Sequence, residues 1–163
     1  MNRLPGSPRV LAIDPVSRGF GIVVFENPTL PIEWGVKDLR ENQEERSLLL
    51  VTSLLEQFKP DVVVVEDTEH SSCRRCKRVR VLLSSIRALT ESWSVPLAGI
   101  SRDQVYDSLG HRTKHQVATF IASCLPELSP LLPPNRKPWM CEDPRMAIFD
   151  AAAFALTFYQ SLD

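Results

Sequence analysis

The stretch that most restricts the fold of this chain is DVVVVED, residues 61 to 67. Its four consecutive valines show no alternation of polar and apolar positions, and such a run is typical of a strand that is covered on both faces. A strand of this kind belongs to a parallel or mixed sheet with helices on either side, so the sequence predicts an α/β fold. The run also ends on acids, Glu66 and Asp67, where a buried strand reaches the edge of its sheet.

The segments around this strand follow the patterns of further strands and helices. Short apolar runs predict strands at residues 10–13, 21–25, about 32–36 and 95–100, and glycines 19 and 21 predict a tight turn between the first two. Apolar residues at helical spacing predict helices at 42–58, 76–93, 102–109 and 113–124. A last helix is expected after Pro144, with Asp143 as its N-cap, and should run to about Gln160.

This order of elements predicts one topology. The first three strands can form an antiparallel meander, whereas the later strands are each reached through a helix and should lie parallel to the first. The fourth strand then pairs with the first. We therefore expect a five-stranded mixed sheet of order 3-2-1-4-5 flanked by helices.

The length and composition fit a single domain. A chain of 163 residues suits one compact domain, residues 1–163, better than two. Residues 126–138 contain five prolines and predict a loop within that domain. No apolar run approaches the roughly 18 residues of a membrane span, and the N-terminus lacks the apolar core of a secretory signal. We expect a cytoplasmic protein with no membrane partner, whose four cysteines are reduced thiols or metal ligands.

Three acids occupy positions at which this topology would bring them together. Asp14 and Glu66 end the first and fourth strands, whose carboxyl ends should share one edge of the sheet. Asp150 interrupts an alanine-rich helix that could press close to the sheet. Carboxylates that meet in a half-dry site must share a proton or bind a cation, and their hard oxygens suit Mg²⁺ or Mn²⁺. Alternatively, Asp14 caps a turn, and the other two acids face water.

A basic segment follows the fourth strand. Residues 71–90 contain no acid and six basic residues: Arg74, Arg75, Lys77, Arg78, Arg80 and Arg87. Such a segment could bind the phosphates of a nucleic acid, although a solvated helix face would look the same. It also contains the pair Cys73 and Cys76, which is half of a structural zinc site. Zinc completed by His70, by Cys141 or by the same pair across a dimer, a redox pair, and plain thiols all remain open.

Four motifs in this chain resemble those of the RuvC-type Holliday junction resolvases, within the RNase H-like superfamily. They are Ile13-Asp14-Pro15 with Ser17, Arg18 and Gly21; KPDVVVVED; Thr113 and Lys114 with Gln116 and Val117; and FDAAAFAL. The resemblance covers most of the chain and implies an RNase H-like fold. Two positions depart from the family pattern: Val16 replaces a glycine after Asp-Pro, and Ala147 stands where the family commonly has Asp or His.

The resemblance also implies an activity. It implies an endonuclease that uses two Mg²⁺ or Mn²⁺ ions to cut branched DNA as a homodimer, in recombination and repair. Asp14 would bridge both ions, Glu66 would hold one and Asp150 the other, while Lys114 would stabilise charge on the phosphate. Asp143, or else Glu142, could supply the group missing at Ala147. The expected DNA contacts are Arg74, Arg75, Lys77, Arg78, Arg80 and Lys114.

Two rival interpretations remain open. The departures at Val16 and Ala147 would suit a catalytically degenerate protein that binds nucleic acid on the same fold. An actin-like ATPase shares the sheet and an Asp after its first strand. That class normally needs a duplicated fold and glycine-rich phosphate loops, which 163 residues do not provide.

Overall fold

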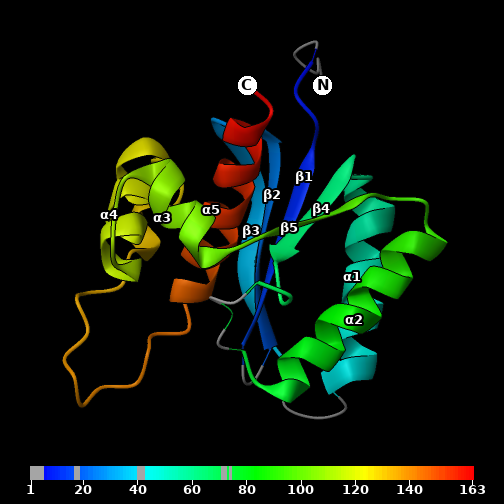
Figure 1. Ribbon diagram of the computed structural model, residues 1–163, viewed down its shortest axis with the longest axis horizontal. Coiled ribbons are helices and arrows are strands. Elements are labelled where there is room, and N and C mark those ends of the chain that lie inside the picture. The colour runs from blue at the N-terminus through cyan, green and yellow to red at the C-terminus, as the bar shows by residue number, and fades with distance from the viewer. Residues whose placement is uncertain (1–5, 17–18, 40–42, 71–72, 74) are drawn as a thin grey trace.

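A five-stranded sheet divides the molecule into two layers of helices (Figure 1). The structure is a computed structural model that describes residues 6–16, 19–39, 43–70, 73 and 75–163. The strands are β1 (Val10–Val16), β2 (Gly19–Asn27), β3 (Leu30–Asp38), β4 (Val62–Glu66) and β5 (Leu97–Ile100). Their order is β3-β2-β1-β4-β5; β1 to β3 are antiparallel, and β4 and β5 lie parallel to β1. The predicted α/β class and strand order are confirmed.

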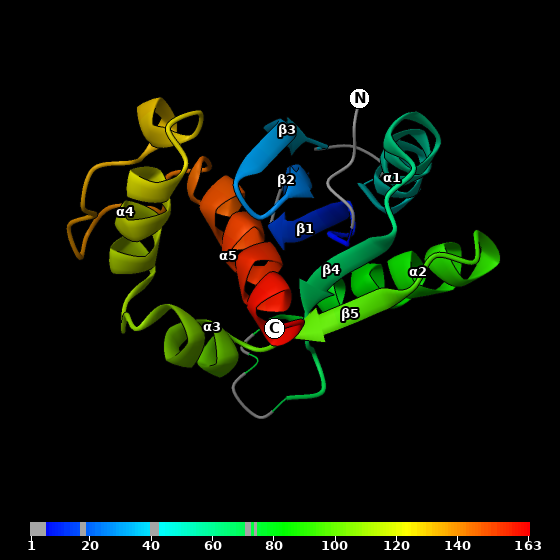
Figure 2. The same cartoon turned by 90° about the horizontal axis from the view of Figure 1, so that it is seen from above.

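The helices cover both faces of this sheet, as Figure 2 shows from above. On one face lie α1 (Gln43–Phe58) and α2 (Lys77–Ser92); on the other lie α3 (Arg102–Leu109), α4 (Lys114–Cys124) and α5 (Met146–Ser161). Within the described part of the chain, no helix is both long and apolar enough to cross a membrane.

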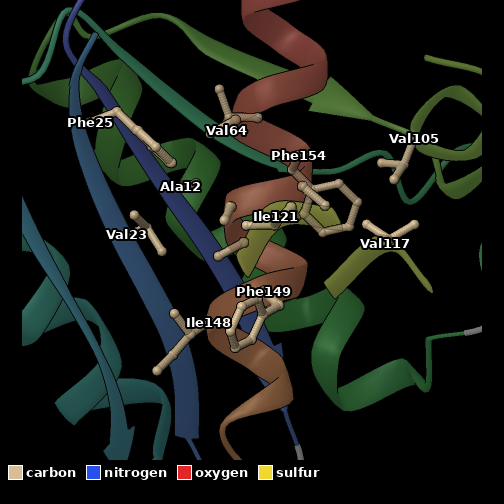
Figure 3. Packing of buried hydrophobic residues seen from close by; sticks show 14 of the residues in the cluster. Ala12, Val23, Phe25, Val64, Val105, Val117, Ile121, Ile148, Phe149 and Phe154 are labelled. Atoms are coloured by element: carbon tan, nitrogen blue, oxygen red, sulfur yellow. The ribbon is translucent and has the colours of Figure 1, made fainter. Parts of the chain in front are cut away.

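The valines of β4 show why both layers are needed. Val62 and Val64 pack in a core with α3, α4 and α5, whereas Val63 and Val65 pack in a second core with α1 and α2. Figure 3 shows Val64 in the first core, to which Phe154 of α5 also belongs. Because successive side chains of a strand point to opposite faces, the residues of β4 alternate between the two cores.

Strand β1 is longer than the sequence predicted. Its pairing with β4 ends at Ala12 opposite Val64, but its pairing with β2 continues to Val16 opposite Gly19. Asp14 is therefore still paired with β2, but it lies beyond the last residue pair between β1 and β4. Glycines 19 and 21, which were expected to mark a turn, both belong to β2, and residues 17 and 18 between the two strands are outside the described residues.

Gly21 allows α5 to lie unusually close to the sheet. A Cβ added to Gly21 would come within 2.3 Å of the Ala147 carbonyl carbon and 2.7 Å of the Ala147 Cβ. A side chain at Gly21 would therefore clash with the first turn of α5. The small residues at these two positions thus bring the first turn of α5 against β2.

Two further details differ from the sequence predictions. The proline-rich segment contains a 3₁₀ turn, η1 (Ser129–Leu131), which follows the fully buried Leu128. The last helix starts at Met146, and its N-cap position is Arg145 rather than Asp143. Asp143 still accepts a hydrogen bond from the backbone N–H of Arg145, at 2.9 Å, so its carboxylate stabilises the turn that leads into the helix.

Candidate metal centre

The register of the sheet places Asp14 and Glu66 side by side. Val10 is paired with Val62 and Ala12 with Val64, so two residues further along each strand bring Asp14 and Glu66 to the same level. Because side chains alternate along a strand, both acids lie on the face of the sheet that packs against α5. Both are buried, with 0% of the surface of Asp14 and 4% of that of Glu66 exposed. Two carboxylates thus leave adjacent parallel strands at one edge of the sheet, as predicted.

Asp150 joins them from α5. The helix packs along this face of the sheet, and Asp150 is buried on it. Its charge is close enough to Asp14 to raise the pKa of that carboxyl, and a shared arginine links it to Glu66. The structure therefore brings together the three predicted acids, which we call the acidic cluster: Asp14, Glu66 and Asp150.

Arg75 lies between two members of this cluster. It donates hydrogen bonds to Asp14 Oδ1 through Nη2 and, at 2.5 Å, to Glu66 Oε2 through Nε. Its Nη1 also donates to the carbonyl of Pro15, at 3.0 Å. Arg75 is also a predicted DNA contact, and that role stays a prediction. Its side chain is 17% exposed, and its guanidinium balances the charge of the two strand-borne carboxylates.

Arg102 links the third acid to the cluster, and sequence analysis missed it. Its Nη1 lies 3.1 Å from Asp150 Oδ1 and its Nε lies 3.4 Å from Glu66 Oε1. Its guanidinium carbon also lies 5.1 Å from the ring centre of Phe154. Arg102 begins α3 directly after β5, whose carboxyl end shares this edge of the sheet. That position was a signal in the sequence which could have identified the residue.

Lys114 contacts the cluster from the start of α4. Its Nζ lies 3.2 Å from Asp150 Oδ2 and 3.1 Å from Glu142 Oε1. Thr113 fixes the beginning of the helix by accepting a hydrogen bond from the Gln116 N–H. The lysine is therefore beside the acids, where the resemblance placed it. Its role in catalysis stays a prediction.

The two acids that precede α5 have different partners. Asp143 binds Arg145 through Oδ1 at 3.0 Å and Oδ2 at 2.7 Å, and these hydrogen bonds lower its pKa. Glu142 instead reaches Lys114, which also holds Asp150. Of this pair, Glu142 is thus the one whose carboxylate is linked to the acidic cluster, through the lysine.

The pKa values of Asp14 and Asp150 are shifted in opposite directions. Burial, together with repulsion by Asp150, raises the pKa of Asp14 to about 7 even though Arg75, Arg102 and Lys114 oppose the shift. Burial also acts to raise the pKa of Asp150, but Arg102 and Lys114 outweigh it and hold that pKa below its usual value. The second carboxylate oxygen of Asp14, Oδ2, is buried and has no hydrogen-bond partner among the described residues. The cluster thus contains an unsatisfied acceptor.

These residues fit a hard divalent cation. The donors are carboxylate oxygens, which Mg²⁺ and Mn²⁺ prefer, and Asp14 Oδ2 offers an unused one. In the part of the chain that the structure describes, no three His, Cys, Asp or Glu residues are gathered into a ready metal site. We attribute this to the guanidinium groups of Arg75 and Arg102, which lie between the carboxylates. Binding a cation would require Arg75 to withdraw from its two acids.

The predicted DNA contacts are only partly gathered at this edge. Lys77, Arg78 and Arg80 lie exposed in the first turn of α2, while Arg74 is outside the described residues. Arg80 donates to the carbonyls of Thr68 at 2.9 Å and Arg75 at 3.1 Å, so it also braces the segment that carries Arg75.

The two cysteines of the predicted half zinc site differ in environment. Cys73 is buried, Cys76 is exposed, and both are free thiols. Backbone N–H groups at the start of α2 lower the pKa of the Cys76 thiol.

The sheet order, the helices on both faces and the acids at the ends of β1 and β4 define an RNase H-like fold. A structure of Thermus thermophilus RuvC matches with a TM-score of 0.65 and 22% identity, over 94% of this chain and 96% of that one. T. thermophilus RuvC in complex with a Holliday junction substrate matches with a TM-score of 0.68 and 22% identity, over 95% and 96%. The yeast mitochondrial Holliday junction resolvase Ydc2 matches with a TM-score of 0.60 and 19% identity, over 95% and 80%.

These likenesses establish the fold. This chain has the fold of the RuvC-type Holliday junction resolvases, which confirms at the level of structure the resemblance seen in its motifs. Comparisons with protein-family models and with curated protein sequences found no match.

Proposed function

We propose that this protein is a divalent-metal-dependent endonuclease that hydrolyses phosphodiester bonds of branched DNA, in recombination or repair. One observation carries the proposal: three buried carboxylates from β1, β4 and α5 are linked through Arg75 and Arg102 at one edge of an RNase H-like sheet. One of the similar structures, T. thermophilus RuvC, is bound to a Holliday junction substrate, which supports a four-way junction as the DNA form.

Asp14, Glu66 and Asp150 would hold the cation. Two Mg²⁺ or Mn²⁺ ions, when bound, would supply a more acidic water and offset the charge of the leaving oxygen. Lys114 would stabilise negative charge on a phosphate beside Asp150, a role that the contact of its Nζ with that acid supports. Asp143 is the fourth ligand predicted from sequence, but Glu142 is the stronger candidate because it shares Lys114 with Asp150.

The basic start of α2 would contact the DNA backbone. Lys77, Arg78 and Arg80 are exposed there, next to the segment that carries Arg75, and Arg74 is predicted to join them. Contacts of this kind give an affinity that falls steeply with salt and position the protein without reading sequence.

A homodimer is part of the proposal, because a two-fold axis would set two cleavage sites symmetrically on a four-way junction. The buried residues of α2, including Val79, Leu82, Leu83 and Ile86, pack within the domain. Exposed apolar residues on the same layer, Leu49 of α1 and Val81 of α2, are candidates for the contact between the two copies. Sedimentation of wild type and of Val81→Glu tests this part of the proposal.

The test is cleavage of labelled four-way junctions, flaps and linear duplex with Mg²⁺, Mn²⁺ or a chelator. We expect metal-dependent cleavage of a branched substrate and none of linear duplex. Asp14→Asn should abolish cleavage and keep junction binding, with Asp107→Asn, an exposed acid of α3, as the matched control. Failure to cut any substrate with either metal would reject the nuclease.

A second function has a specific observation in its favour. Arg75 and Arg102 already neutralise the acidic cluster, and Ala147 leaves one position of the family site without a polar group. A catalytically degenerate protein that binds nucleic acid would look like this. It would bind junctions, cut none of them, and bind no more weakly after Asp14→Asn.

A further inference from the structure

Trp139 is an exposed aromatic residue that the proposed chemistry does not use. It lies in the segment between α4 and α5, and 80% of its surface is in contact with solvent. The turn that carries it is closed by a hydrogen bond from the Met140 N–H to the Lys137 carbonyl, at 3.0 Å. Arg136 Nη1 also donates to the Met140 carbonyl, at 3.3 Å. The structure therefore holds the tryptophan out in water on a defined turn.

Two neighbouring hollows connect this turn with the side chains that hold the acidic cluster. A hollow of about 480 Å³ is lined by the turn residues Arg136 and Met140 together with Lys114, the lysine that binds Asp150. A second hollow, of about 450 Å³, is lined by Arg75 and Ala147. The two hollows share residues 141–144 as a common wall. In Figure 1 this segment hangs below α4, at the end of the molecule where α5 begins.

The chemistry of the turn suits one kind of ligand. Trp139 offers a flat apolar surface, and Arg136 and Lys137 place two positive charges within three residues of it. Single-stranded nucleic acid is bound by this combination, in which bases stack on aromatic side chains while cations follow the backbone. A paired duplex keeps its bases stacked on one another and offers the tryptophan no free face.

We propose that the segment of residues 133–144 is a binding site for an unpaired base of the DNA substrate, with Trp139 as its stacking surface. The site rests on the proposed function, because it identifies which part of a branched substrate the protein holds next to the acidic cluster. An unpaired base at a branch point would lie on Trp139. Arg136 and Lys137 would contact its neighbouring phosphates.

The first test measures binding of a short oligothymidylate in the presence of a chelator, by quenching of tryptophan fluorescence. We expect wild type to be quenched and Trp139→Phe to lose most of that quenching, with Trp93→Phe as the control for another exposed tryptophan. Trp139→Ala should weaken oligothymidylate binding roughly 5- to 150-fold, the range for loss of one stacked base. Trp139→Phe, which keeps an aromatic ring, should bind within about threefold of wild type.

The second test compares a four-way junction with a linear duplex of the same sequence. Trp139→Ala should weaken junction binding and leave duplex binding unchanged, whereas Leu30→Ala, which removes an exposed apolar residue of β3, should change neither. Equal binding of oligothymidylate by wild type and Trp139→Ala would overturn the inference, as would an equal loss on junction and duplex. Cleavage by wild type is measured separately, so a base site without nuclease activity and a nuclease without a base site give different results.

Discussion

Arg75 donates a hydrogen bond to the buried carboxylate of Asp14, 61 positions earlier in the chain, and it does so from a segment that contains no acid. The same guanidinium holds Glu66. The guanidinium of Arg75 thus balances the charge of two carboxylates that are proposed to bind a metal ion. Metal binding and the position of Arg75 should therefore be coupled.

Replacing Arg75 with glutamine should strengthen metal binding and lower the stability of the metal-free protein. A hydrogen-bonded charge in this setting is worth roughly 1.5–3 kcal/mol, so Mg²⁺ should bind about 10- to 150-fold more tightly. Without metal, the two acids lose their counter-ion, and the free energy of unfolding should fall by about 3–5 kcal/mol. Calorimetric titration and urea unfolding with a chelator measure the two effects. The exposed Lys77→Gln serves as the control, and weaker Mg²⁺ binding by Arg75→Gln would contradict the coupling.

Binding of Mg²⁺ should depend on pH around neutrality. Burial and the charge of Asp150 raise the pKa of Asp14 to about 7, so below that pH the carboxyl carries a proton that a cation must displace. Affinity should fall as the pH decreases from about 7, by up to about tenfold per unit. Titration calorimetry in buffers of different ionisation enthalpy should show proton release at pH 6.5 or so. An affinity that does not change between about pH 5 and pH 8 would be incompatible with Asp14 as a ligand.

Replacing Arg102 should lower the free energy of unfolding far more than replacing an exposed arginine. It is 14% exposed and links Glu66 to Asp150, so Arg102→Gln leaves two buried acids without this partner and should cost about 3 kcal/mol. The matched control is Arg112→Gln: its ion pair with Asp107 is 3.8 Å long, and both side chains are more than three quarters exposed. That change should cost less than about 1 kcal/mol. Equal effects in urea unfolding would argue against a buried charge network.

Gly21→Ala tests the close approach of α5 to β2. The added methyl group would lie 2.3 Å from the carbonyl carbon of Ala147, so the helix must move or the strand must bend. Overpacking of this kind typically costs about 1–3 kcal/mol. It should also weaken Mg²⁺ binding, because Asp150 lies one turn further along the same helix. Gly35→Ala in β3 is the control, since a Cβ there meets no atom within 4 Å. Equal stability of the two variants would contradict this packing.

The sequence predicted most of the fold because its strongest patterns are those of burial. The valines of β4 predict a two-sided sheet, and the crossover rule then determines which strands are adjacent. It predicted the end of β1 less well, because pairing beyond Asp14 depends on β2, which the apolar run does not reveal.

The acidic cluster was predictable for a related reason. Each of its three acids follows or interrupts an apolar segment, so its placement stands out. Its cations were not predictable in the same way. Arg102 had a signal in its position after β5, but Arg75 had none, and only the folded chain shows that its guanidinium turns inward. Glu142 and Asp143 differ in their partners, Lys114 and Arg145, and no spacing rule in the sequence reveals that difference.

The most direct measurement is a crystal structure of the protein soaked with Mn²⁺, with anomalous difference density used to locate the ion. We predict density bounded by the carboxylates of Asp14, Glu66 and Asp150, with the Arg75 side chain withdrawn from the first two. An ion bound elsewhere, with Arg75 still on Asp14 and Glu66, would contradict the assignment of a metal centre.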